Sequence, residues 1–203
     1  MTTQPMEQAV VFEGVMEGIH RSFGPRLTPA LREELRRLGV DFHALLPAYP
    51  LELWEDVVRR IARALYPELP EHAQWERMGF EWMEGYVQTV LGRAVLAMGR
   101  VIGPRRALER MGRNFRTAGN YLHAEAVVHG PTDVEVRTHL VEPFASQWRN
   151  RPSVMPWYRV GVLRGSLHAL GVTGARVEVV QWDHARHQGS YRLTWGAAPS
   201  EAA

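Results

Sequence analysis

Two histidines in one short polar segment form the densest group of possible metal ligands in this sequence. His184 and His187 lie within the segment 183–189, where a tight turn could bring the two imidazole rings together. Imidazole suits zinc, copper or nickel, but two ligands without a third rarely make a metal site. We therefore interpret the segment as a solvent-exposed hairpin turn. We expect neither histidine to belong to a functional site, and we predict no bound metal and no other cofactor.

A row of arginines could bind an anion. All 24 basic residues of the chain are arginine, whose guanidinium group pairs with carboxylates and phosphates through two hydrogen bonds at once. Arg106, Arg110 and Arg113 recur at steps of four and three, which makes them neighbours on one helix face, and Arg116 follows just beyond. The row could hold a phosphate, an acidic ligand or an acidic partner, or it could be a solvated face. The net charge of +2 is too small to indicate nucleic acid, and we expect no nucleic-acid partner.

The polar segment 114–121 joins the last predicted helix of the first half to the first predicted strand. One interpretation is that it only ends the helix, with Gly119 in the left-handed conformation. The other is that its polar side chains converge on a ligand where helices meet sheet. We favour recognition for Arg116 and helix capping for Asn114 and Asn120.

Aromatic and methionine side chains on the predicted helix 71–99 could line an apolar pocket. A stripe of this kind is usually core, but methionine and aromatic residues also make adaptable surfaces for hydrophobic ligands. The residues that we predict to bind a ligand, from this stripe and the polar junction together, are Trp82, Tyr86, Arg113, Asn114, Arg116, Asn120 and Tyr121.

Motifs of catalysis are missing from the sequence. There is no glycine-rich phosphate loop, nucleophile elbow or zinc-protease motif, and the absence of cysteine excludes thiolate chemistry and disulfides. We name no catalytic residue and expect no enzyme. No signal peptide and no run of about 18 apolar residues is present, so we predict no membrane span and a cytoplasmic location.

The first half of the chain predicts a succession of helices. Apolar residues recur at helical spacing over 10–23, 28–39, 51–65, 71–99 and 104–115. Residues 45–50 lie between two of these helices as a proline-rich connector. The apolar stripe of 71–99 is too broad for a surface helix, so we expect this segment to be the long central helix.

The second half of the chain predicts a sheet. Alternating residues indicate a hairpin of strands 121–128 and 133–140, then a helix over 157–170, then a hairpin of strands 176–182 and 190–195. The fold class is therefore α+β: N-terminal helices with a long central helix, followed by a β-β-α-β-β unit with a four-stranded antiparallel sheet. We expect one domain over 10–196, a flexible N-terminus over 1–9 and a disordered tail over 197–203.

Several motifs resemble a large paralogous family of unknown function found in myxobacteria. The likeness extends over about residues 10–196. Its motifs are Leu45–Trp54, Ala64–Pro67, Gly85-Tyr86 with Thr89, Gly92-Arg93, Gly103–Leu108 and Asn114–Thr117. Membership of that family implies no known reaction.

The order of the elements also resembles the group of folds that includes haem-nitric-oxide-binding, vinyl-reductase-type and vesicle-tethering domains. This resemblance implies a small apolar ligand, a haem or an acyl chain enclosed between helices and sheet. The helix 104–115, where a haem-ligating histidine would be sought, contains no histidine, and the Tyr-x-Ser-x-Arg pattern for the haem carboxylates is missing. Haem is therefore disfavoured.

Two functional hypotheses remain. The first is a non-enzymatic regulatory or sensory domain that binds a small apolar or amphipathic ligand between the long helix and the sheet. The second is a protein-interaction module, most simply a homodimer, that uses Trp148, Trp157 and the arginine row. An internal cavity of about 300 Å³ or more would favour the first hypothesis.

Overall fold

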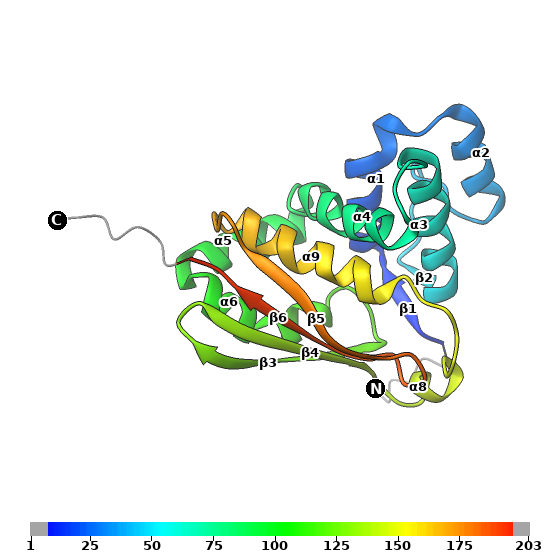
Figure 1. Cartoon of the computed structure of the whole chain (residues 1–203). Helices are drawn as coiled ribbons and strands as arrows, with labels where there is room; N and C mark the ends of the chain where they lie inside the picture. Colours follow the sequence, from blue (N-terminus) through cyan, green and yellow to red (C-terminus); the bar gives the residue numbers. More distant parts are fainter. Residues whose placement is uncertain (1–7, 197–203) are drawn as a thin grey trace, which may run out of the picture.

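The computed structural model describes residues 8–196, with every side chain except those of Arg113 and Asn114. Residues 1–7 and 197–203, which include most of the predicted flexible ends, lie outside the described residues. Figure 1 shows helices stacked above a four-stranded sheet, with α9 (Met155–Ala169) lying directly on the sheet and α4 (Glu71–Tyr86) lying on α9.

The chain enters the fold through a short strand. β1 (Val10–Phe12) pairs antiparallel with β2 (Ala48–Pro50), and α1 (Glu13–Phe23) follows β1 directly. The predicted helix 10–23 therefore begins three residues later than expected, and the predicted connector 45–50 ends in a strand. The reason is that Val10 and Val11 are buried in the β1–β2 pair rather than in a first helical turn.

The next two helices agree with the sequence. After the short 3-10 turn Gly24–Arg26, Thr28 caps α2 (Pro29–Arg37) by accepting a hydrogen bond from Leu31 N at 3.2 Å. Gly39 follows α2 in the left-handed region at a φ of 96°. α3 (Leu51–Leu65) buries the apolar face that its spacing predicts.

The predicted long helix 71–99 is wrong in its extent, because it is two helices. α4 ends at Tyr86, and α5 (Val90–Ile102) begins after a turn. The buried Thr89 side chain makes the break: its Oγ1 donates to Tyr86 O at 2.8 Å and accepts from Gly92 N at 2.9 Å. The predicted helix 104–115 is likewise divided, into α6 (Pro104–Glu109) and α7 (Met111–Phe115).

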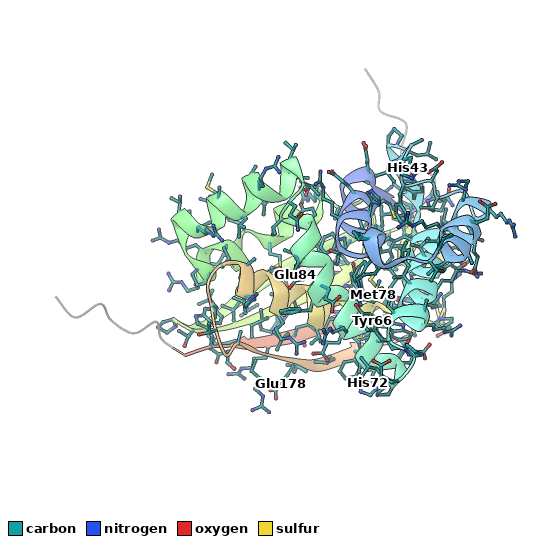
Figure 2. All side chains as sticks on the ribbon, turned by 90° about the horizontal axis from the view of Figure 1, so that it is seen from above. His43, Tyr66, His72, Met78, Glu84 and Glu178 are labelled. Carbon is teal, nitrogen blue, oxygen red and sulfur yellow. The ribbon has the colours of Figure 1, made fainter. Side chains whose placement is uncertain are left out.

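α4 is the central helix because glycines let its backbone touch helices on both sides. A Cβ atom on Gly85 would lie 2.5 Å from Gly18 O of α1. A Cβ atom on Gly79 would lie 2.0 Å from Tyr158 O of α9, and one on Gly161 would lie 2.0 Å from Glu76 O. These distances leave no room for any side chain, so the three helices pack backbone against backbone. In the view from above, the labelled Met78 and Glu84 lie along this helix near the middle of the molecule (Figure 2).

The sheet confirms the predicted antiparallel unit. Its strands are β3 (Leu122–Gly130), β4 (Asp133–Leu140), β5 (Arg176–Asp183) and β6 (Gln188–Thr194), in the order β3-β4-β6-β5. Val134, Val136, Tyr191 and Leu193 on its inner face are fully buried. They form one core cluster with α9 residues such as Leu163. The fold class is therefore α+β, as the sequence predicts.

The β5–β6 turn is only partly exposed, contrary to the prediction. His184 is exposed and its Nδ1 accepts a hydrogen bond from Trp182 Nε1 at 3.0 Å. His187 is buried, because its ring packs edge-on against Trp148 and Trp182, with ring centroids 5.9 and 6.1 Å away. Trp148 follows the short helix α8 (Phe144–Gln147) and is buried too, so it offers no surface for the dimer that we considered.

Candidate ligand-binding cavity

A cavity of about 350 Å³ lies between α4, α5, the α6–α7 segment and the C-terminal half of α9. Its floor is the end of α4, where Trp82 and Tyr86 occupy successive turns of one face and stack with ring centroids 4.7 Å apart. Met111, Phe115, Val162 and Leu170 are among the other wall residues, and α5 contributes Val95, Leu96, Met98 and Ile102.

The polar atoms of the wall are mostly engaged elsewhere. Trp82 Nε1 donates to Val15 O at 2.9 Å, and Ser166 Oγ donates to Val162 O at 2.7 Å within α9. Burial raises the pKa of Tyr86, and a hydrogen bond with the Thr117 side chain partly offsets this effect. Arg110 is the one charged residue among the described lining, and it is exposed to solvent. The cavity is therefore apolar inside, with a single guanidinium group at its border.

α5 closes the cavity with few side-chain contacts to the core. Its only fully buried positions are Gly92 and Gly99. A Cβ atom on Gly99 would lie 2.7 Å from Leu170 Cδ2, so glycine lets the helix approach the end of α9. Val95 and Leu96 are half-buried and face the cavity, while the opposite side of α5 is exposed.

The structure separates the predicted ligand-binding residues into two groups. Trp82 and Tyr86 line the cavity, whereas Arg116 is exposed and lies outside its lining. Tyr121 is buried away from the lining, and burial raises its pKa to about 12. The side chains of Arg113 and Asn114 lie outside the described residues, and Arg110 of the arginine row borders the cavity.

Asn120 has a clear structural role at the polar junction. Its Oδ1 accepts from Val10 N at 2.8 Å and its Nδ2 donates to Gln8 O at 3.0 Å, so it ties the entering strand to the junction. Gly119 bridges to Val11 and is not left-handed, contrary to the prediction. Glycine is needed there for close approach, since a Cβ atom would lie 2.3 Å from Val10 O.

The sequence interpretation missed the α5 and α9 walls of the cavity. Val95 and Leu96 fall within the predicted helix 71–99 and Ile102 lies beyond it, because Thr89 was not recognised as a helix cap. Thr89 follows Tyr86 by three residues and precedes Gly92 by three. A threonine in this position is a typical helix N-cap, and it was the signal that a new helix begins after Tyr86.

A second group of buried polar residues lies at the other end of α9. Glu55 of α3 accepts hydrogen bonds from Ser153 Oγ at 2.6 Å and from Arg59 Nη2 at 2.7 Å. Burial nevertheless raises its pKa to about 7. Arg159 is 2% exposed and donates to Thr138 Oγ1 at 2.8 Å, with its guanidinium 5.6 Å from the centre of the Trp182 ring. Its Nε and Nη2 are buried, and Arg159 lies outside the lining of the cavity.

Among residues 8–196, no group of three or more His, Asp or Glu side chains is placed to hold a metal ion. In the same range no helix combines the length and the apolar character that crossing a membrane requires.

Comparison with solved structures identifies the class of fold. A variant of the Tt H-NOX domain superposes with a TM-score of 0.65 at 14% identity, over 95% of this chain and 98% of that one. A mutant of the T. Tengcongensis H-NOX domain gives a TM-score of 0.60 at 15% identity, over 92% and 99% of the two chains. An oxygen-binding H-NOX domain related to soluble guanylate cyclases gives 0.61 at 15% identity, over 94% and 95%. The chain therefore has an H-NOX-like fold.

The chain belongs to the family described as "Protein of unknown function (DUF2378)", whose model matches residues 9–196. Both resemblances that the sequence indicated, to a family of unknown function and to this group of folds, are confirmed. A search of curated protein sequences finds no match.

The cavity does not fit haem, the group whose distortion is the subject of similar solved structures of the H-NOX family. Haem iron is most often held by an imidazole or a thiolate. The described lining offers neither, and α6 and α7 contain no histidine. Tyr86 is the one lining residue with a hydroxyl on a ring, and that hydroxyl is hydrogen-bonded to Thr117. Haem carries two propionate groups, and Arg110 is the one charged residue of the described lining that could pair with them.

Proposed function

We propose that this protein is a sensory or regulatory domain that binds a small apolar or amphipathic molecule in the cavity between α4, α5 and α9. The observation that carries the proposal is a cavity of about 350 Å³ with an almost wholly apolar lining. That volume lies within the range of about 300–1,000 Å³ that is usual for small-molecule sites. The fold is consistent with the proposal, since one similar solved domain binds oxygen.

The lining chemistry favours a ligand with an apolar body. Trp82 and Ser166 already use their donors within the protein, so hydrogen bonds from the inner wall do not select the ligand. Arg110 at the border can pair with a carboxylate or sulfonate that stays near solvent. An amphiphile with an anionic end would satisfy both parts of the site.

The experiment is binding of 1-anilinonaphthalene-8-sulfonate, followed by its displacement with dodecanoate or dodecanol. We expect the wild-type protein to bind the probe and both competitors to displace it. Ala107→Phe places a ring in the cavity wall and should weaken probe binding by about tenfold or more, because the volume that accepts the probe is reduced.

The matched control is Ala97→Phe, an exposed position on α5 outside the lining. It should leave probe affinity unchanged, and circular dichroism should show both variants to be folded. Equal probe affinity in Ala107→Phe and wild-type protein would contradict the proposal. Native mass spectrometry of protein from its own host would then identify any molecule retained in the cavity.

A homodimer through Trp157 and the arginine row stays a prediction. Trp157 is 37% exposed, whereas Trp148 is not available for such a contact.

A further inference from the structure

The outward face of α5 is apolar although no part of residues 8–196 covers it. Val90, Ala94, Ala97 and Val101 follow one another at steps of four, three and four, so they form one stripe along the helix, with Ala94 at the edge of the cavity lining. Val90 is 77% exposed and Val101 is 84% exposed. Met98, which is 53% exposed, lies between this stripe and the cavity that it lines. Among the described residues, Val90 and Val101 are the two most exposed large hydrophobic side chains.

The charge around this stripe has one sign. Residues 88–108 contain four arginines and no aspartate or glutamate. Arg93 and Arg100, seven residues apart, flank the stripe on the same side. In the described part of the chain their side chains contact only backbone oxygens: Arg93 Nη1 lies 2.5 Å from Gln88 O, and Arg100 Nη2 lies 3.3 Å from Ala169 O.

The nearest acidic residue after this segment neutralises only one of its arginines. Glu109 pairs with Arg105 at 3.5 Å and does not reach Arg93 or Arg100. An aliphatic ridge bordered by unpaired guanidinium groups is complementary to a surface that is negatively charged outside and apolar beneath. The headgroup and upper acyl regions of a bilayer with anionic lipids have this arrangement.

A second copy of the chain fits this face less well. Antiparallel pairing of two α5 helices would place Arg93 of one copy near Arg100 of the other, and α5 has no carboxylate to compensate. A folded protein partner is also less suited, because the stripe has no aromatic anchor of the kind on which protein interfaces depend. A folded partner would need a groove that matches the protruding aliphatic side chains of α5. A lipid bilayer needs no such groove, because its acyl chains are fluid.

We propose that α5 is a membrane-surface docking element that binds the headgroup region of an anionic lipid bilayer. With 13 residues α5 is too short to span a bilayer, so it lies in the plane of the surface with Val90 and Val101 toward the acyl chains. Arg93 and Arg100 then contact lipid phosphates. This inference rests on the outer face of α5 and does not depend on what occupies the cavity.

The test is co-sedimentation of the full chain with vesicles of phosphatidylcholine alone and of phosphatidylcholine mixed with phosphatidylglycerol. We expect binding to the mixed vesicles at low salt, and little binding to the neutral vesicles or at high salt, because salt screens charges at a surface. The pair Arg93→Gln and Arg100→Gln should lower the partition coefficient about 25-fold, since each arginine near an anionic surface contributes about fivefold.

The pair Val90→Glu and Val101→Glu should abolish binding to the mixed vesicles. Both sites are solvent-exposed, and a glutamate at the first position of α5 suits the helix N-terminus, so folding should be retained. Val180→Glu on β5, 58% exposed, is the matched apolar control, and Arg186→Gln, 77% exposed, is the matched charge control. Neither control should change vesicle binding.

Three results with vesicles would overturn the inference: no binding to the mixed vesicles, equal binding to neutral and mixed vesicles, or unchanged binding in both α5 double variants. Analytical ultracentrifugation tests the second copy directly. Self-association that Val90→Glu and Val101→Glu remove would assign this face to a dimer and would also overturn the inference. Val90 and Val101 do not line the cavity, so probe binding in these variants should match the wild type. A failure of membrane docking is thereby separated from a failure of the proposed ligand site.

Discussion

Glu55 shows how burial competes with pairing at a single carboxyl group. It has an arginine at 2.7 Å and a serine hydroxyl at 2.6 Å, both of which favour the charged form. Desolvation outweighs them, because the group is 2% exposed, and its pKa rises to about 7. The nearby buried Arg159 also favours the charged form without reversing this balance.

The raised pKa of Glu55 predicts a loss of stability as pH increases. The unfolded chain releases this proton near the ordinary pKa of 4.5, whereas the folded chain holds it to about pH 7. Between these two values the folded state binds more protons, so the free energy of unfolding falls as pH rises, by up to about 3 kcal/mol. Urea denaturation of wild type and Glu55→Gln across this window measures the effect.

The difference in unfolding free energy between the two proteins should shift in favour of Glu55→Gln as pH passes from 4.5 to 7. Glu178→Gln is the control, because its side chain is 53% exposed in an ion pair with Arg176. That variant should follow the wild-type pH profile. A parallel profile for Glu55→Gln would mean that the pKa of Glu55 is the same in the folded and the unfolded protein.

At the scale of elements, Thr89 determines where α4 ends and α5 begins, and therefore where α5 forms its wall of the cavity. The two hydrogen bonds of its hydroxyl end α4 and start α5, and Gly92 must be glycine because a Cβ atom there would lie 1.8 Å from Tyr86 O. Without this break, a continuous helix would carry Val95 and Leu96 away from Trp82 and no cavity would form between them.

Thr89→Val should lower the free energy of unfolding by about 1–2 kcal/mol, because it removes the cap of α5 and leaves Gly92 N without its partner. Affinity for the anilinonaphthalene probe should fall as well, since α5 forms one wall of the cavity. Chemical denaturation and probe titration give the two values. Thr89→Ser keeps the hydroxyl and should behave like wild type. A Thr89→Val protein of unchanged stability would show that packing alone positions α5.

Periodicity was sufficient to predict most elements, and single polar side chains account for the errors. One face of each of α2, α3, α9, β3 and β4 is buried. One-sided burial produces a regular spacing of apolar residues, which can be seen in the sequence. The α4–α5 break depends on one hydroxyl, and β1 depends on pairing with residues 48–50, about 40 residues away. The burial of His187 depends on Trp148, which no local pattern connects to it.

The prediction of the site was limited in the same way, because contacts between distant residues are not visible in a local sequence pattern. Trp82 and Tyr86 were found because aromatic residues on one helix face are visible in the sequence. Arg116 and Asn120 were chosen for being near the helix–sheet junction, but chain position does not determine which way a side chain points. Asn120 binds backbone atoms of the entering strand.

At the scale of the whole molecule, the helices above the sheet are held together through glycine. Gly161→Ala should lower the free energy of unfolding by about 3 kcal/mol, because the added methyl group meets Glu76 O, a backbone atom that cannot move alone. Thermal and urea denaturation measure the loss.

Gly14→Ala is the matched control for this substitution. Gly14 is in α1 with nothing within 4 Å of its Cβ position, so alanine there should raise stability by about 0.5 kcal/mol through helix propensity. If Gly161→Ala were as stable as Gly14→Ala, α4 and α9 would have to separate at no cost, and the close backbone packing would not be required for the fold.

The contact between α4 and α9 also bears on how ligand preference can change during evolution. Met83 of the cavity wall lies four residues from Gly79, and Val162 lies next to Gly161, so backbone contact determines the position of that wall. Exchange of a lining side chain then alters the volume and shape of the cavity without moving the helices that carry it. Under the proposed function, a change of ligand preference in this protein would then need only single substitutions in the lining and no change at the glycine contacts.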